Sequence, residues 1–150
     1  MTTNYYIGNN GSDTHLLPAL SSMHLALYTY VHPLMMSERR DESFYTRIAG
    51  IPQFFKRIVA DHLHTLVLKF DPKEATLEPL PCLEELRKLQ GFMESTLLQR
   101  YPCLRKITLD IGCPIEMLPW WKMRLAECYP KLLSKGMLDI MTTGMRWYVT

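Results

Sequence analysis

The chain has 150 residues, of which 47% are hydrophobic, so it is large enough for one domain with a sizeable core. Lys and Arg number 17 against 15 Asp and Glu, and the net charge of +2 favours neither nucleic acid nor an anionic membrane as a partner. No stretch is apolar enough to span a bilayer, and the four cysteines form no Cys-x-x-Cys pair. These features favour a cytoplasmic or nuclear protein with free thiols.

Residues 1–16 are polar and rich in turn-forming types, so we expect a polar lead-in or N-terminal cap, followed by a single domain over 17–150. A first strand is predicted over 23–30 and a loop over 32–42. Two short helices should then meet at Gly50, the second opened by Pro52 and continuing through Val59. Further along, we expect a strand over 65–70, a helix over 83–97, a strand over 106–111, a helix from Pro119 and a strand over 137–140.

One apolar pattern recurs without gaps in three segments, at offsets of 43 and 41 residues. In each, an apolar residue is followed by others three, five and seven positions later. The three sets are Leu20, Met23, Leu25 and Leu27; Leu63, Leu66, Leu68 and Phe70; and Leu104, Ile107, Leu109 and Ile111. Such alternation places the side chains on one face of a strand. Its repetition indicates that one strand-bearing unit is stacked several times.

A fourth unit follows when one insertion is allowed. Tyr101-Pro102 precedes the Leu-Asp-Ile strand that ends at Ile111, and Tyr129-Pro130 precedes a second Leu-Asp-Ile strand that ends at Ile140. The two Tyr-Pro corners are 28 residues apart, a usual length for a strand-plus-helix repeat. The fold class is therefore predicted as α/β, a short irregular stack of roughly four units with parallel strands on one face and helices on the other.

The first unit, Leu17-Pro18-x-Leu20-x-x-Met23-x-Leu25, and its successors match the Leu-x-x-Leu-x-Leu strand of leucine-rich repeats. Together with the stretches 62–68 and 120–140, this pattern resembles the leucine-rich-repeat region of fungal F-box-like proteins over residues 17–141. The resemblance implies a curved α/β repeat fold and a role in binding another protein. The sixteen residues before Leu17 are too few for the F-box itself, so the resemblance covers the repeats alone.

The side chains between the buried strand positions should point outward. If neighbouring strands pair in register, Lys69 lies beside Asp110, and His24 shares a row with Val67, Thr108 and Asp139. Adjacent tryptophans on a helix point about 100° apart, so one of Trp120 and Trp121 should lie in the core and the other at its rim. The residues expected to bind a partner are His24, Val67, Lys69, Thr108, Asp110, Asp139 and Trp121. The alternative is an ordinary solvated face, or one covered by the tail.

The leading functional hypothesis is a protein–protein interaction module with no catalytic residue, cofactor or metal. Its partner is expected to be a protein, not nucleic acid or membrane, and self-association through open strand edges is a further expectation. The rival is a small enzyme or small-molecule binder whose pocket at the strand ends is lined by Tyr and His, namely Tyr5, Tyr6, Tyr28, Tyr30, His24 and His32. The candidate nucleophile is Cys113, with Asp110 and any histidine. His62 and His64 alone are too few for a structural zinc site.

Overall fold

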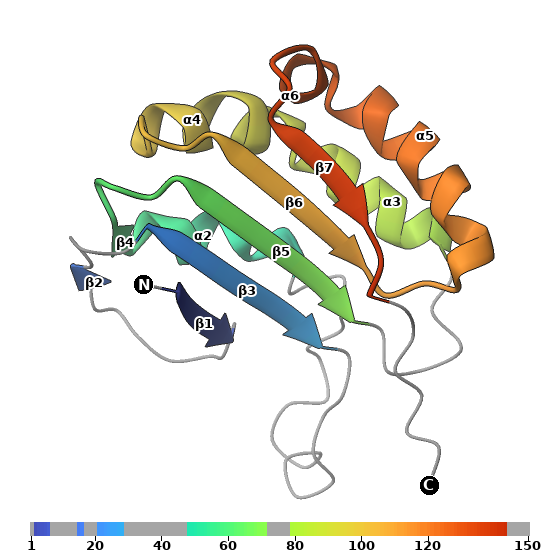
Figure 1. Ribbon diagram of the computed structural model, residues 1–150, viewed down its shortest axis with the longest axis horizontal. Coiled ribbons are helices and arrows are strands. Elements are labelled where there is room, and N and C mark those ends of the chain that lie inside the picture. The colour runs from blue at the N-terminus through green and yellow to red at the C-terminus, as the bar shows by residue number, and fades with distance from the viewer. Residues whose placement is uncertain (1, 7–14, 17–20, 29–47, 72–78, 144–150) are drawn as a thin grey trace, which may run out of the picture.

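The computed structural model describes residues 2–6, 15–16, 21–28, 48–71 and 79–143, with only the backbone for 2–6, 15–16, 24–28 and 71. One sheet contains five strands, all parallel, in the order β1-β3-β5-β6-β7 (Figure 1). These are β1 (Thr2–Tyr6), β3 (Ser22–Tyr28), β5 (Thr65–Asp71), β6 (Lys106–Ile111) and β7 (Leu138–Met141). A second, two-stranded sheet pairs β2 (His15–Leu16) with β4 (Ile58–Val59).

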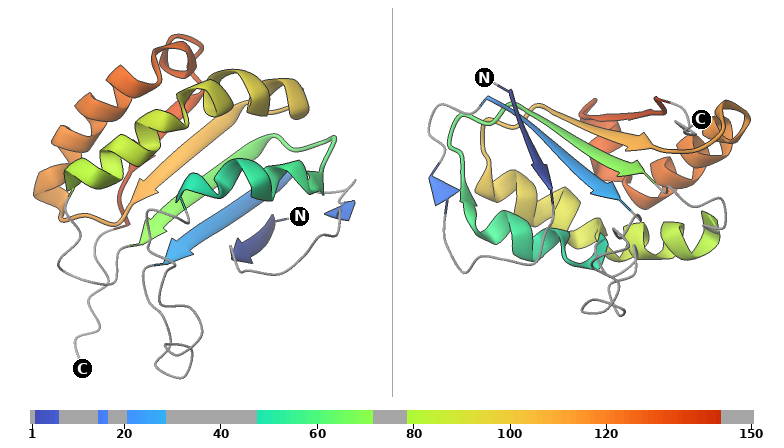
Figure 2. Two further views of the ribbon diagram at one scale, coloured as in Figure 1. Left: turned by 180° about the vertical axis from the view of Figure 1, so that it is seen from behind. Right: turned by 90° about the horizontal axis from the view of Figure 1, so that it is seen from below.

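Each strand of the main sheet pairs with the next main-sheet strand along the chain, and helical segments lie in the connections from β3 onward. They are α2 (Ile51–Lys56), α3 (Pro79–Lys88), the π-helix η2 (Phe92–Thr96), α4 (Leu97–Arg100), the 3-10 helix η3 (Ile115–Met117), α5 (Leu118–Cys128) and α6 (Pro130–Ser134). The views in Figure 2 place α2, α3, α4 and α5 on the same side of the sheet. The described part of the protein is thus a two-layer α/β arrangement.

The core lies between these two layers. Alternate residues of the strands are buried there, including Met23, Leu66, Leu68, Phe70, Ile107, Leu109, Ile111 and Ile140. Leu63 and Leu104, which precede β5 and β6 in the repeated pattern, are buried as well. Because burying one such side chain contributes roughly 1.5–3 kcal/mol, the recurring apolar positions supply much of the stabilisation of the sheet. The predicted period-two strands at 65–70 and 106–111 are confirmed.

Three local predictions differ from the structure. The helix opened by Pro52 ends at Lys56, and Ile58 and Val59 form strand β4 instead of continuing it. The helix expected over 83–97 is divided into α3, η2 and α4. Within the expected polar lead-in or N-terminal cap, residues 2–6 form β1, the edge strand beside β3, consistent with the high strand propensity of Thr and Tyr. The break at Gly50 is confirmed, since its carbonyl accepts the first hydrogen bond of α2, from the backbone N–H of Phe54 (3.1 Å). The loop over 32–42 lies outside the described residues.

Candidate binding surface

The face of the sheet away from the helices carries the residues that the sequence predicted to point outward. Strand pairing places Lys69 opposite Asp110, and it aligns His24, Val67, Thr108 and Asp139 in one row across four strands. Both parts of the predicted register are therefore confirmed. We call this surface the helix-free face and define it by its described side chains: Thr65, Val67 and Lys69 on β5; Lys106, Thr108 and Asp110 on β6; and Asp139 and Met141 on β7.

Exposure varies along the helix-free face. Val67 and Lys69 are half-buried, and Asp139 is exposed. Thr108 and Asp110 were expected to be accessible, but their exposed fractions are only 5% and 4%. Both lie on β6, which has β5 on one side and β7 on the other, so neighbouring strands crowd them. His24 holds its predicted place in the row, while its side chain lies outside the described residues.

Asp110 has a structural partner that the sequence did not reveal. Its Oδ1 accepts a hydrogen bond from the backbone N–H of Thr143 (3.0 Å) and a longer one from the Thr143 hydroxyl (3.4 Å). The neighbouring hydroxyl of Thr142 donates to the carbonyl of Cys113 (3.2 Å). The segment that leaves β7 is thereby attached to the carboxyl end of β6, where it covers Asp110.

Lys106 and Asp139 form an ion pair across neighbouring strands, whereas the sequence predicted Lys69 and Asp110 as the charged neighbours. Lys106 Nζ lies 3.7 Å from Asp139 Oδ2, two positions off the direct pairing of Asp139 with Thr108, and about half of each side chain is exposed. An exposed pair of this kind contributes at most about 1 kcal/mol. The pair therefore adds little to the stability of the sheet.

Trp121 is not at the rim of the molecule. Its exposed fraction is 4%, so it is the core member of the tryptophan pair, and Trp120 is the half-buried one. The two rings meet edge to face at 5.1 Å, and the Arg124 guanidinium lies 5.8 Å from the centre of the Trp120 ring. The prediction that one tryptophan lies in the core and the other at its rim is confirmed. The expected partner contact of Trp121 does not fit the structure, because the side chain is buried.

The two Tyr-Pro corners hold successive units together. Tyr101 ends α4, and its buried hydroxyl donates to the carbonyls of Phe55 in α2 (3.1 Å) and Ile58 in β4 (2.7 Å). Tyr129 ends α5 in the same way, and its hydroxyl donates to the carbonyl of Leu86 in α3. Burial raises the pKa of both phenols, which therefore stay protonated as donors. The corner was visible in the sequence, but this contact was not.

Glu94 makes a third contact between units. It is 7% exposed, and in η2 both it and its neighbour Met93 are buried. Its Oε2 accepts a hydrogen bond from the backbone N–H of Leu132 (3.0 Å), and its Oε1 accepts one from Gln90 Nε2 (3.0 Å). Leu132 belongs to the first turn of α6, whose N–H groups have no partner within the helix. The carboxylate thus caps the short helix that leads into β7.

The rival hypothesis of a pocket at the strand ends depends on Tyr and His side chains that lie outside the described residues. A shallow depression of about 580 Å³ does occur elsewhere, among the helices. It is lined by Pro52, Lys56, Phe92, Thr96, Gln99 and Arg100. The Arg100 guanidinium there is already engaged, since it donates to the carbonyls of Lys56 (2.7 Å) and Ile58 (3.1 Å).

The suggested nucleophile is poorly placed for catalysis. Cys113 is buried, and that burial raises the pKa of its thiol, so little reactive thiolate forms at neutral pH. His62 and His64 precede β5, whereas Cys113 follows β6, so the length of a strand, roughly 20 Å, separates them. In the described part of the chain, no three His, Cys, Asp or Glu side chains are grouped closely enough to hold a metal ion.

No family model, no curated protein and no solved structure matches this chain. Within the described residues, every helix is too short or too polar to cross a membrane. The four cysteines are free thiols. The functional argument therefore depends on the geometry of the helix-free face and of the edges of the sheet.

Proposed function

We propose that this protein is a short, irregular leucine-rich-repeat-type module that binds another protein through the helix-free face. One observation carries the proposal: an all-parallel sheet whose described helices lie on a single face. Parallel sheets are normally covered on both faces and have continuously apolar strands. Here the outward positions of β5 and β6 are polar except for Val67, namely Thr65, Lys69, Lys106, Thr108 and Asp110. Stacked repeats are the usual exception, and they bind partners on such a surface.

The exposure data restrict where a partner can bind. The accessible described members of the helix-free face combine two apolar side chains with charges of both signs. They are Thr65, Val67, Lys69, Lys106, Asp139 and Met141. Thr108 and Asp110 serve as a packed support beneath them. Trp120, half-buried on α5 and in edge-to-face contact with the buried Trp121, belongs to the helix layer and is not part of this binding surface.

Site-specific photo-crosslinking tests this proposal. A photoreactive residue at Val67 should form a crosslink to a partner protein, whereas the same residue at Met123, 53% exposed on α5, should not. Val67→Arg should also abolish co-purification of the protein crosslinked from position 67, and Met123→Arg should leave it unchanged. Crosslinks from position 123 alone would place the binding site on the helix layer instead. Circular dichroism of both variants checks that the fold is retained.

Self-association remains a separate prediction. Among the described strands, β1 and β7 are the two edges of the main sheet, and either could pair with a second copy. Light scattering at high protein concentration tests this, and a monomer throughout the range would exclude it.

A further inference from the structure

Basic side chains gather along the edge of the sheet at which its strands begin. The three segments 56–64, 100–106 and 131–137 lead into β5, β6 and β7, and Asp61 is their single acidic residue. Their Lys and Arg residues, which we call the basic edge, are Lys56, Arg57, Arg100, Arg105, Lys106, Lys131 and Lys135.

Backbone hydrogen bonds show that these segments lie side by side. The N–H groups of Arg105 (2.8 Å) and Lys106 (3.1 Å) both donate to the carbonyl of His64, and the N–H of Ile107 donates to the carbonyl of Met137 (2.7 Å). Figure 1 shows β4, the end of α4 and α6 along this same edge. The ends of the three segments are thus adjacent where the strands begin, and the Arg100 guanidinium lies against the carbonyls of Lys56 and Ile58. We call this row of basic segments the stripe.

A contribution to the stability of the fold explains only some of the basic residues in this stripe. Cations near the C-terminal end of a helix are favoured by its dipole, which applies to Lys56, Arg100 and Lys135. Arg105 and Lys106 lie instead at the start of a strand. Arg105 is exposed and forms no salt bridge within the described residues, so nothing in the fold accounts for its charge.

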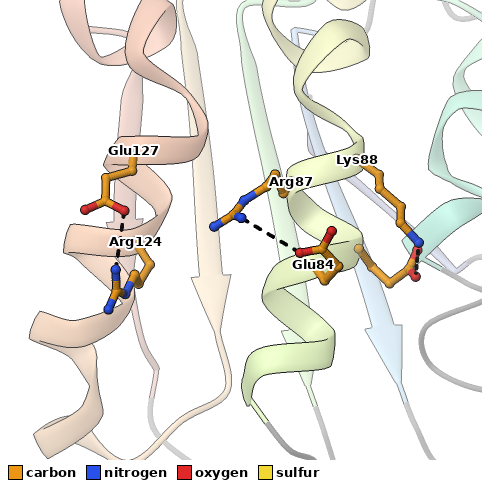
Figure 3. A network of polar contacts seen from close by, with 6 residues as sticks. Glu84, Arg87, Lys88, Arg124 and Glu127 are labelled. Atoms are coloured by element: carbon orange, nitrogen blue, oxygen red, sulfur yellow. Dashed lines mark hydrogen bonds and ion pairs between the residues drawn. The ribbon is translucent and has the colours of Figure 1, made fainter.

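The remaining described part of the chain has the opposite balance of charge. Outside the three segments, acidic residues outnumber basic ones, and most of the basic ones are paired. On α3 and α5 the pairs are Glu84–Arg87 (3.9 Å), Glu85–Lys88 (2.9 Å) and Arg124–Glu127 (3.5 Å), as Figure 3 shows. The charges are therefore segregated although the net charge of the whole chain is only +2.

We propose, building on the protein-binding function above, that the basic edge docks an acidic segment of the protein partner. Neighbouring parallel strands lie about 4.8 Å apart. An extended peptide that crosses their amino ends passes Arg105 and Lys106 at the start of β6 and Lys135 three residues before β7. The edge adjoins the helix-free face through Lys106, which belongs to both surfaces. Such rim charges speed association and select the partner more than they increase affinity.

The test uses fluorescence anisotropy with a short labelled peptide of alternating Glu and Ser. The wild-type protein should bind it, and binding should weaken as salt is raised, because exposed charges are screened. Arg105→Glu should weaken binding by about 2- to 30-fold, since reversal replaces one exposed attraction by a repulsion. Lys122→Glu is the matched control: it makes a similar charge reversal at an exposed position on α5, and it should leave binding within about twofold of wild type.

Three results would overturn the proposal: no binding of the Glu-Ser peptide at low salt, equal losses in Arg105→Glu and Lys122→Glu, or tighter binding of a single-stranded DNA oligomer. The last result would assign the stripe to nucleic acid. Crosslinking from position 67 is independent of this assay. A partner crosslinked there despite a failed peptide assay would preserve the proposed function and remove only the acidic segment.

Discussion

Removing the Glu94 carboxylate should destabilise the C-terminal unit. The carboxylate is buried and accepts the backbone N–H of Leu132, which lies in the first turn of α6. Glu94→Ala leaves that N–H without its acceptor. A hydrogen bond to a charged group contributes roughly 1.5–3 kcal/mol, and we expect the free energy of unfolding to fall by about that amount.

Glu94→Gln separates the role of the charge from that of the acceptor. The amide keeps a carbonyl oxygen that can accept from Leu132, and Gln90 is exposed and free to reorient its own amide. Charged hydrogen bonds are roughly twice as strong as neutral ones, so this variant should lose about half as much stability as Glu94→Ala. Glu127→Gln is the surface control, because its partner Arg124 is solvent-accessible and the pair contributes at most about 1 kcal/mol.

Urea denaturation followed by tryptophan fluorescence measures these differences, since Trp120 and Trp121 lie on α5 next to the affected unit. A loss of 1.5–3 kcal/mol corresponds to a decrease in Tm of about 3–12 °C for a chain of this length. Hydrogen exchange at the Leu132 amide should accelerate in Glu94→Ala. The reasoning fails if Glu94→Ala stays within about 0.5 kcal/mol of wild type, or if Glu94→Gln is as costly as Glu94→Ala.

Three further outcomes follow from other contacts. Tyr129→Phe should cost about 0.5–1.5 kcal/mol in urea denaturation, because the Leu86 carbonyl loses the phenol but keeps its bond from the backbone N–H of Leu89. Asp110→Ala should accelerate hydrogen exchange at the Thr143 amide, and unchanged exchange would show that this contact does not fix the segment after β7. Burial raises the pKa of Cys82 from 9.0 to about 12, so only the unfolded thiol ionises between these values, and stability should fall there by about 1.4 kcal/mol per pH unit. Cys82→Ala should flatten that slope, measured by urea denaturation at about pH 9 and 11; an unchanged slope would mean that the thiol is not its cause.

The strands could be predicted because their signal is local and repeated. The apolar residues of the pattern whose side chains the structure describes are buried against the helix layer, so the spacing predicts both the period and the register between strands. That is why the opposition of Lys69 and Asp110 follows from counting positions. The resemblance to leucine-rich repeats stays a prediction.

Exposure could not be predicted in the same way, because it depends on segments distant in sequence. Asp110 is buried by its position between two strands and by Thr143, 33 residues later. The alternation that identifies an outward position does not show what covers it. For the tryptophan pair, the helical angle shows that one ring is core, but only the packing of α5 against the sheet determines which one. Ile58 and Val59 became a strand for a similar reason, because they pair with His15 and Leu16.

Three buried polar contacts between units join a side chain to backbone. Tyr101 bonds α2 and β4, Tyr129 bonds α3, and Glu94 bonds α6, so each contact spans two successive units. Apolar packing alone tolerates sliding of one unit past the next, because it has no preferred direction. A buried hydrogen bond to one particular backbone group does not tolerate such sliding, since misalignment of the units leaves that group unpaired. These three contacts therefore fix the stagger of the units, and with it the spacing of the side chains on the helix-free face and along the basic edge.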